Sequence, residues 1–176
     1  EIPGVIFKNR AESLNQELFD EATSALEWED IEYEPYWDYW VDYYKSKNQY
    51  SDQMDIEIHT VRVFARNRCP IGCKFCVSTF QLTAATGGNV PVISSTDANL
   101  VNVVKRIVDS HPRVRTIYFT DDDFCINKKV AIRTCEKLSE QGFGNLTFMC
   151  FARITDISEA LVIALKKANF RLLFIG

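Results

Sequence analysis

Three cysteines stand close together in the motif CPIGCKFC at residues 69–76. Cys69, Cys73 and Cys76 have the spacing C-x3-C-x2-C. Thiolates are soft ligands that suit iron–sulfur clusters and zinc, and one short loop can bring all of them to a single metal centre. Three protein ligands would leave one iron of a four-iron cluster open to a small molecule. The spacing therefore favours an iron–sulfur cluster that also binds a ligand.

Other uses of clustered cysteines fit this spacing less well. Bacterial ferredoxins use C-x2-C-x2-C-x3-C, and no fourth cysteine lies close to these three. A structural zinc site has four ligands, commonly in two C-x2-C-like pairs, and Cys73 with Cys76 makes one pair with no second pair after it. A disulfide framework would need a secreted context. Zinc and purely structural thiols stay as the alternatives. Cys125, Cys135 and Cys150 are expected to be buried small hydrophobic residues.

Hydrophobic patterning predicts the elements that must position these thiols. Strands are expected over residues 56–66, 114–120, 146–152 and 170–175, with helices over 97–110, 127–141 and 159–168 between them. Thr96 or Ser95 and a capping box at residues 156–159 are expected to start two of the helices. Strand–helix alternation predicts parallel strands with right-handed crossovers. The alternation thus predicts an α/β fold with about four parallel strands.

Two more motifs whose side chains could bind a ligand lie at the ends of predicted strands. FTDDDF at residues 119–124 places Asp121 and Asp122 after the second strand, and ARITDI at 152–157 places Arg153 after the third. Parallel α/β barrels carry their ligand-binding groups at the carboxyl ends of the strands. The cysteines, the acids and the arginine are therefore expected at the same end of the barrel.

Residues 1–55 are expected to form an N-terminal helical and aromatic leader, and residues 56–176 the barrel core. A helix is predicted over residues 11–27, and nine Trp and Tyr residues follow within residues 28–50. Aromatic rings can stack on bases, but this segment is acidic, which opposes nucleic-acid binding. We expect the leader to pack on the barrel or on a neighbouring domain.

Charge is divided unevenly along the chain. Residues 1–57 hold 15 Asp and Glu against 4 Lys and Arg, and the remainder holds 9 against 16. The basic residues are scattered, so we expect the acidic leader to pack against the basic half or to be solvated. No apolar run is long enough to span a bilayer, and clustered cysteines fit a reducing compartment. The sequence predicts a cytoplasmic protein.

The motif C-P-x-x-C-x-F-C after a short strand resembles the signature loop of radical S-adenosylmethionine (radical SAM) enzymes. FTDDDF resembles the F-x-D-D-x-F element at the end of their second strand, and ARITDI resembles the arginine-bearing end of their third. The resemblance covers roughly residues 56–176. The family has a TIM-like (β/α) barrel with more strand–helix units than this chain, which predicts a partial barrel of about four parallel strands with strand 170–175 at an exposed edge. Such a fragment is expected to show little turnover alone.

The resemblance implies that Cys69, Cys73 and Cys76 bind a 4Fe–4S cluster, whose fourth iron chelates S-adenosylmethionine. In the family, one electron from the cluster cleaves the sulfonium and releases a 5′-deoxyadenosyl radical, which abstracts hydrogen from a substrate. The electron would come from a donor of the flavodoxin or ferredoxin type. The substrate, a small molecule or another compound, is not readable from the sequence.

The same resemblance implies which residues hold S-adenosylmethionine. Phe75 would contact the adenine, and Asp121 or Asp122 would bind the methionyl amine through a charge-assisted hydrogen bond. Arg153 would pair with the methionyl carboxylate. The choice between Asp121 and Asp122 stays open at this point.

The beginning of the chain, IPGVI followed by a helix and an aromatic segment, is similar to the connector between a cobalamin-binding domain and a radical SAM barrel. This similarity implies cobalamin as a further cofactor, held by a domain outside this chain, and radical methyl transfer as the reaction in that case. The alternative function is a non-catalytic iron–sulfur or zinc binding module.

Overall fold

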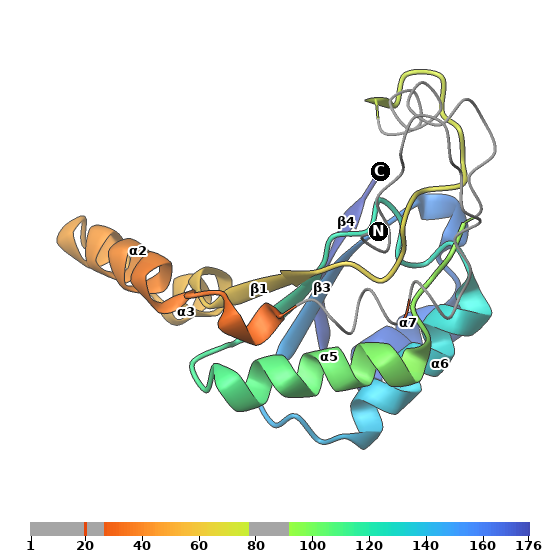
Figure 1. The fold of residues 1–176 in the computed structure, drawn as a ribbon. Helices are drawn as coiled ribbons and strands as arrows, with labels where there is room; N and C mark the ends of the chain where they lie inside the picture. The colour runs from red at the N-terminus through yellow and green to blue at the C-terminus, as the bar shows by residue number, and fades with distance from the viewer. Residues whose placement is uncertain (1–19, 21–26, 78–91) are drawn as a thin grey trace, which may run out of the picture.

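A single parallel sheet organises the computed structural model, which describes residue 20 and residues 27–77 and 92–176. The strands are β1 (Thr60–Val63), β2 (Thr116–Phe119), β3 (Thr147–Ala152) and β4 (Phe170–Ile175), in the spatial order β1-β2-β3-β4. The helices α5 (Asp97–Ser110), α6 (Lys128–Glu140) and α7 (Glu159–Lys167) alternate with them and cover one face of the sheet (Figure 1). This confirms the predicted α/β fold with four parallel strands, consistent with a partial β/α barrel.

The prediction is wrong at the first strand, which was expected over residues 56–66. Residues Asp52–Ile58 instead form helix α3, and β1 begins at Thr60. Ile56 and Ile58 alternate as in a strand, but Ser51 starts a helix, because its Oγ accepts a hydrogen bond from the Met54 backbone N–H at 3.3 Å. A local cap therefore outweighs a short apolar alternation.

Side-chain caps also begin α5, α6 and α7. Thr96 Oγ1 accepts from the Asn99 N–H at 3.3 Å at the start of α5, as predicted. For α7 the predicted capping box at residues 156–159 is wrong. Ser158 is the cap, accepting from the Leu161 N–H at 3.4 Å, while Asp156 belongs to the 3-10 turn η2 (Ile154–Asp156). The reason is that the Asp156 carboxylate pairs with Arg153 at 2.7 Å and is not free to cap.

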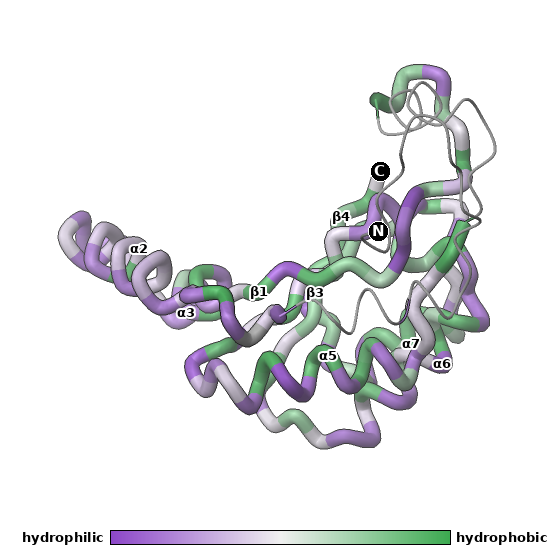
Figure 2. Tube along the Cα trace, viewed as in Figure 1, coloured by the Kyte–Doolittle hydropathy of each residue, from purple (hydrophilic) through white to green (hydrophobic). Residues whose placement is uncertain are grey.

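The core lies between the sheet and its three covering helices. Figure 2 shows hydrophobic and hydrophilic residues alternating along these helices, which explains why one side of each can be buried. Phe119 is fully buried and stacks on Phe124, with ring centroids 4.8 Å apart, and on Phe148 at 6.0 Å. The buried set also contains Cys125, Cys135 and Cys150, which confirms that these thiols serve as small hydrophobic core residues.

The leader packs at the amino-terminal ends of the strands. It contains η1 (Trp28–Asp30), α2 (Glu34–Ser46) and α3, and Figure 1 shows α2 and α3 extending away from the sheet on that side. Trp37, which is 3% exposed, lies 5.1 Å from the His59 ring and 6.2 Å from the His111 ring, measured between centroids. One face of the aromatic segment therefore packs on the barrel, whereas Tyr36 and Tyr39 are exposed.

Part of the predicted leader lies outside the described residues. This applies to the helix expected over residues 11–27, apart from Asp20 and Glu27. The Asp20 Oδ1 accepts a hydrogen bond from the Thr96 backbone N–H at 3.0 Å. Among the helices that the structure describes, none combines the length and the apolar character needed to cross a membrane.

Candidate functional site

The three clustered cysteines lie on the loop that leaves the carboxyl end of β1. Gly72 has φ +69°, a backbone conformation that favours glycine. The Cys76 N–H donates to the Cys73 carbonyl at 3.0 Å, which closes a turn between these two residues. The three cysteines form no disulfide within the described residues, and each is half-buried. The loop therefore carries three accessible soft donors within one short segment, as the sequence predicts.

The sulfur atoms are not gathered around one point. Within residue 20 and residues 27–77 and 92–176, three or more Cys, His, Asp or Glu side chains do not converge in a metal-binding arrangement. Burial raises the pKa of the Cys69 thiol, and the nearby Asp122, Asp123 and Cys73 raise it further. Metal binding and loop ordering are coupled in such sites, because the thiols gather around the metal and release their protons to solvent. By its chemistry, the donor set fits an iron–sulfur cluster.

Asp121 ties the end of β2 to the end of β1. Both of its carboxylate oxygens accept from the Ala65 backbone N–H, at 2.9 and 3.1 Å, and the residue is 6% exposed. Burial raises the pKa of Asp121 to about 6. Asp121 thus holds the two strand ends together, and its carboxylate already has a partner in the protein.

A pocket of about 180 Å³ lies beside this connection. It is lined by Cys69 from the cysteine loop and by Asp121, Asp122 and Asp123 from the loop after β2, with Arg66 opposite. Asp122 is exposed, unlike its two neighbours. The structure therefore brings the first cysteine and the predicted acids together, and it leaves the Asp122 carboxylate free to meet a ligand.

Arg153 belongs to an ion-pair group beside the pocket, in which Asp123 is buried and the Arg153 side chain is 35% exposed. Its Nε lies 3.0 Å from Asp123 Oδ2 and 2.9 Å from Asp156 Oδ2. Asp123 Oδ1 in turn accepts from the Cys125 N–H at 3.0 Å. Burial raises the pKa of Asp123, and the adjacent Asp156 carboxylate raises it further. A ligand carboxylate would have to share this guanidinium, because Asp123 and Asp156 already bind it.

Two residues of the site were missed at the level of the sequence. Asp123, the last of the three consecutive aspartates, anchors Arg153. Arg66 joins three segments, since its Nη1 donates to the Asp123 carbonyl at 2.7 Å and its Nε donates to Ser94 Oγ at 2.8 Å. The run of three aspartates was a visible signal, but nothing in the local sequence indicated which would be buried.

Phe75 stands apart from these contacts. It is 92% exposed, and its predicted contact with adenine stays a prediction.

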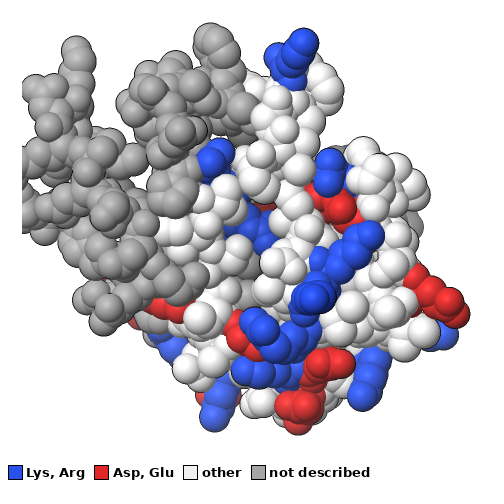
Figure 3. All heavy atoms as spheres, turned by 90° about the vertical axis from the view of Figure 1, so that its right-hand side faces the viewer, with Lys and Arg blue, Asp and Glu red and all other residues white. Residues whose placement is uncertain are grey.

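Figure 3 looks onto the right-hand side of Figure 1 and shows Lys and Arg side chains crossing that face next to acidic ones. Ion pairs such as Arg133 with Asp97, at 2.8 Å, agree with this mixture of charges.

The raised pKa of Asp121 predicts a specific pH dependence of stability. Between the ordinary pKa of 3.8 and about 6, the folded state holds a proton that the unfolded state has released, so the free energy of unfolding falls as pH rises. The full shift corresponds to about 3 kcal/mol. In Asp121→Asn this component is absent. The wild-type stability minus that of the variant should therefore fall by about 3 kcal/mol from about pH 4 to about pH 7.

Urea denaturation at a series of pH values measures this difference. Asp109→Asn is the control, because Asp109 is exposed on α5 and the same substitution there leaves Asp121 and its pH-dependent component in place. A pH-independent gap between wild type and Asp121→Asn would contradict the burial-driven shift.

One curated protein is similar in sequence to part of this chain. No protein-family model matches the chain. Over 116 residues the chain is 23% identical to a protein of Pyrococcus horikoshii named as an uncharacterized methyltransferase. The match covers 65% of this chain and 23% of the relative, so the chain spans about a quarter of that protein's length. The similarity is to an enzyme by name, and it is distant and partial.

Proposed function

We infer that this chain carries the cofactor-binding core of a radical SAM enzyme. The observation that carries this proposal is the placement of three half-buried cysteines, none in a disulfide, on one loop at the carboxyl end of β1, in a sheet whose strands are all parallel. Parallel β/α folds place their reactive groups at that edge. The name of the P. horikoshii relative adds support for methyl transfer as the overall reaction, because S-adenosylmethionine is a methyl donor.

Cys69, Cys73 and Cys76 would hold a 4Fe–4S cluster. When bound, such a cluster supplies the electron for reductive cleavage of S-adenosylmethionine; a flavodoxin- or ferredoxin-type protein would be the electron donor. Cobalamin would enter through a domain outside this chain. The chain itself positions the ligand and excludes water around it.

Each polar group around the pocket would have its own role in binding S-adenosylmethionine. Asp122 is the exposed acid beside Cys69, and it would accept a charge-assisted hydrogen bond from the methionyl amine. Asp121 would hold the ends of β1 and β2 in register through the Ala65 N–H. Arg153, fixed by Asp123 and Asp156, would present its remaining guanidinium surface to the methionyl carboxylate, and Phe75 would cover the adenine.

The test of this function is cleavage of S-adenosylmethionine by the anaerobically reconstituted protein with dithionite as reductant. We expect 5′-deoxyadenosine to form in low yield, detected by chromatography and mass spectrometry. Protein that holds iron but yields no 5′-deoxyadenosine would favour a non-catalytic iron–sulfur module, and protein that holds zinc would favour a zinc-binding module.

We expect Asp122→Ala to weaken S-adenosylmethionine binding about tenfold or more, because a charge-assisted hydrogen bond to the amine is lost. Iron content should stay at the wild-type value, since Asp122 is not a cluster ligand. Equilibrium dialysis with labelled S-adenosylmethionine measures the affinity. Asp109→Ala on the exposed side of α5 is the matched control. Unchanged affinity in both Asp121→Ala and Asp122→Ala would refute the assignment of the amine site to this loop.

A further inference from the structure

A second group of charged side chains lies at the amino-terminal ends of β1 and β2, at the opposite end of these strands from the cysteine loop. Segments of α2, α3 and the loop between α5 and β2 form a pocket of about 310 Å³ there. Its polar lining consists of Lys45, Tyr50, Asp55, His59, Arg113 and Arg115. The volume lies at the lower end of the range of about 300–1,000 Å³ that is typical of small-molecule sites. The pocket is therefore large enough for a small ligand.

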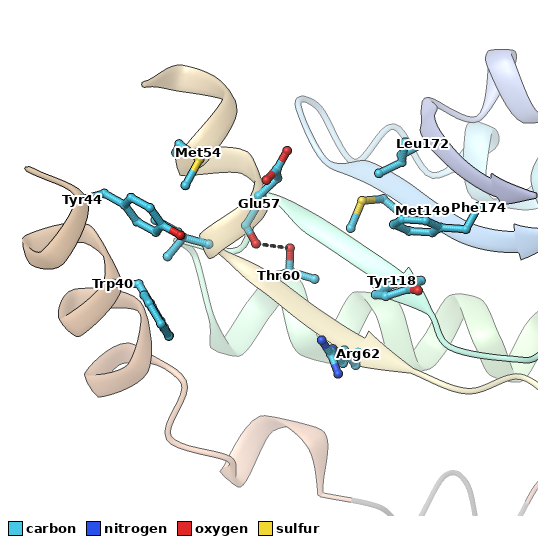
Figure 4. Close-up of a pocket in the computed structure, with 11 residues that line it drawn as sticks. Trp40, Tyr44, Met54, Glu57, Thr60, Arg62, Tyr118, Met149, Leu172 and Phe174 are labelled. Carbon is cyan, nitrogen blue, oxygen red and sulfur yellow. Dashed lines mark hydrogen bonds between the residues drawn. The ribbon is translucent and has the colours of Figure 1, made fainter. Parts of the chain in front are cut away.

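Contacts between α3 and the sheet fix the position of this pocket. Thr116 Oγ1 of β2 donates a hydrogen bond to the Ile56 carbonyl at 2.9 Å. Thr60 Oγ1 of β1 donates to the Glu57 carbonyl at 2.8 Å, which is the bond drawn in Figure 4. The end of α3 is thus bound to the first two strands, and His59, which follows it, is 5% exposed. This side of the pocket is therefore pre-organised.

His59 links the acid of the pocket to one of its cations. Arginine has hydrogen-bond donors only, so His59 Nε2 accepts from Arg113 Nη2 at 3.2 Å. The ring proton is then on Nδ1, which donates to the Asp55 carbonyl at 2.9 Å. In this arrangement the imidazole is neutral, and the charge of the pocket depends on its cations and carboxylates.

Three cations line this pocket with a single carboxylate, that of Asp55. Arg113 Nη2 donates to Asp38 Oδ1, outside the lining, at 2.7 Å. Arg115 Nε lies 3.4 Å from Asp55 Oδ2, which is longer than a typical N–H···O hydrogen bond. Within the described residues Lys45 pairs with no carboxylate, and both Nη atoms of Arg115 have no hydrogen-bond partner. The pocket therefore presents positive charge and N–H donors that the protein itself does not use.

Asp55 cannot neutralise Lys45, because its carboxylate is already bound. The Tyr50 hydroxyl donates to Asp55 Oδ1, and this hydrogen bond, together with burial, raises the pKa of Tyr50 to about 12. The hydroxyl therefore keeps its proton and stays bound to the acid. Lys45 Nζ lies 5.2 Å from the centre of the Tyr50 ring, which attracts a cation but carries no counter-charge. The charge of Lys45 is thus available to an anion in the pocket.

We propose that this pocket binds a phosphate group, either free phosphate or the head group of a small phosphate monoester, through Lys45, Arg113 and Arg115. A phosphate carries about −1.5 to −2 charges near pH 7 and three strong acceptor oxygens, so it can bind donors that come from different elements. A carboxylate, in contrast, is matched by one guanidinium fork. The bound group would bridge α2 and the loop before β2. This assignment does not depend on the proposed radical SAM function, because the cysteine loop leaves the other end of β1.

Isothermal titration calorimetry of the full chain with glycerol 3-phosphate, inorganic phosphate and glycerate tests this assignment, at constant ionic strength and without S-adenosylmethionine. Glycerol 3-phosphate and glycerate share a small polar body and differ in the anionic group. We expect glycerol 3-phosphate to bind about tenfold or more tightly than glycerate. Weaker binding of inorganic phosphate would identify a monoester as the ligand, and equal binding would identify free phosphate; both results agree with the proposal.

Substitutions in the lining locate the binding. Lys45→Met and Arg115→Met should each weaken glycerol 3-phosphate binding about tenfold or more, and Arg115→Lys should retain part of it. Both side chains are exposed, so these variants should fold, which circular dichroism verifies. Lys105→Met is the matched control, because Lys105 is exposed on α5 and does not line the pocket; it should bind as the wild type does.

Two results would overturn the proposal. The first is no heat of binding from either phosphate compound, which would show that the ion pairs of Arg113 and Arg115 only dock the leader on the barrel. The second is glycerol 3-phosphate affinity that is unchanged in Lys45→Met and Arg115→Met, or equally reduced in Lys105→Met, because the anion would then bind elsewhere or without a defined site.

Discussion

Cys73→Ala is expected to abolish the iron–sulfur cluster. After anaerobic reconstitution, the wild-type chain should hold about four iron atoms and absorb broadly near 400 nm, whereas the variant should retain neither the iron nor the absorption. The physical reason is that Cys73 is the middle donor of a three-thiol loop, and the remaining two thiols cannot hold a cubane. Iron and sulfide assays together with visible spectra measure the effect.

The chain provides its own control for this experiment. Cys135 is fully buried on α6, and burial raises the pKa of its thiol to about 12. Such a thiol is neither accessible nor readily ionised, so Cys135→Ala should keep the wild-type iron content. Stoichiometric zinc without iron after anaerobic purification, or equal iron in Cys73→Ala and wild type, would contradict the cluster assignment.

Phe119→Ala should lower the free energy of unfolding by about 3–5 kcal/mol, as deletion of a fully buried aromatic ring usually does. Phe119 stacks on Phe124 and Phe148, and its ring lies 6.0 Å from that of Phe170. The loss would also loosen the turn that carries the aspartates, because Phe119 and Phe124 flank it on both sides. Chemical denaturation followed by circular dichroism measures the change in stability.

Phe151→Ala is the matched control for this change. Phe151 is a phenylalanine of the same sheet, but it lies on the open face and is 37% exposed, so its removal should cost about 1 kcal/mol. A loss of the same size in both variants would show that the packing between sheet and helices does not dominate the stability of this fold.

The cysteine motif and the alternating strands and helices around it could be predicted from the sequence alone. Spacing predicts that Cys69, Cys73 and Cys76 form one ligand set, since the ligands of a loop are local in the chain, and the structure places all of them on one loop. Alternating apolar strands and amphipathic helices predicted the parallel sheet, and α5 was predicted with its observed ends. These features are readable because each depends on periodicity or on contacts a few residues apart.

The division of roles among the strand-end residues depended on tertiary contacts. Asp121 and Asp122 are identical side chains in adjacent positions, yet one is bound by the Ala65 N–H, 56 residues away in the chain, and the other is exposed. Arg153 is held by Asp123, 30 residues away. Burial and charge pairing between distant segments follow from how β1, β2 and β3 are assembled, and no local pattern encodes them.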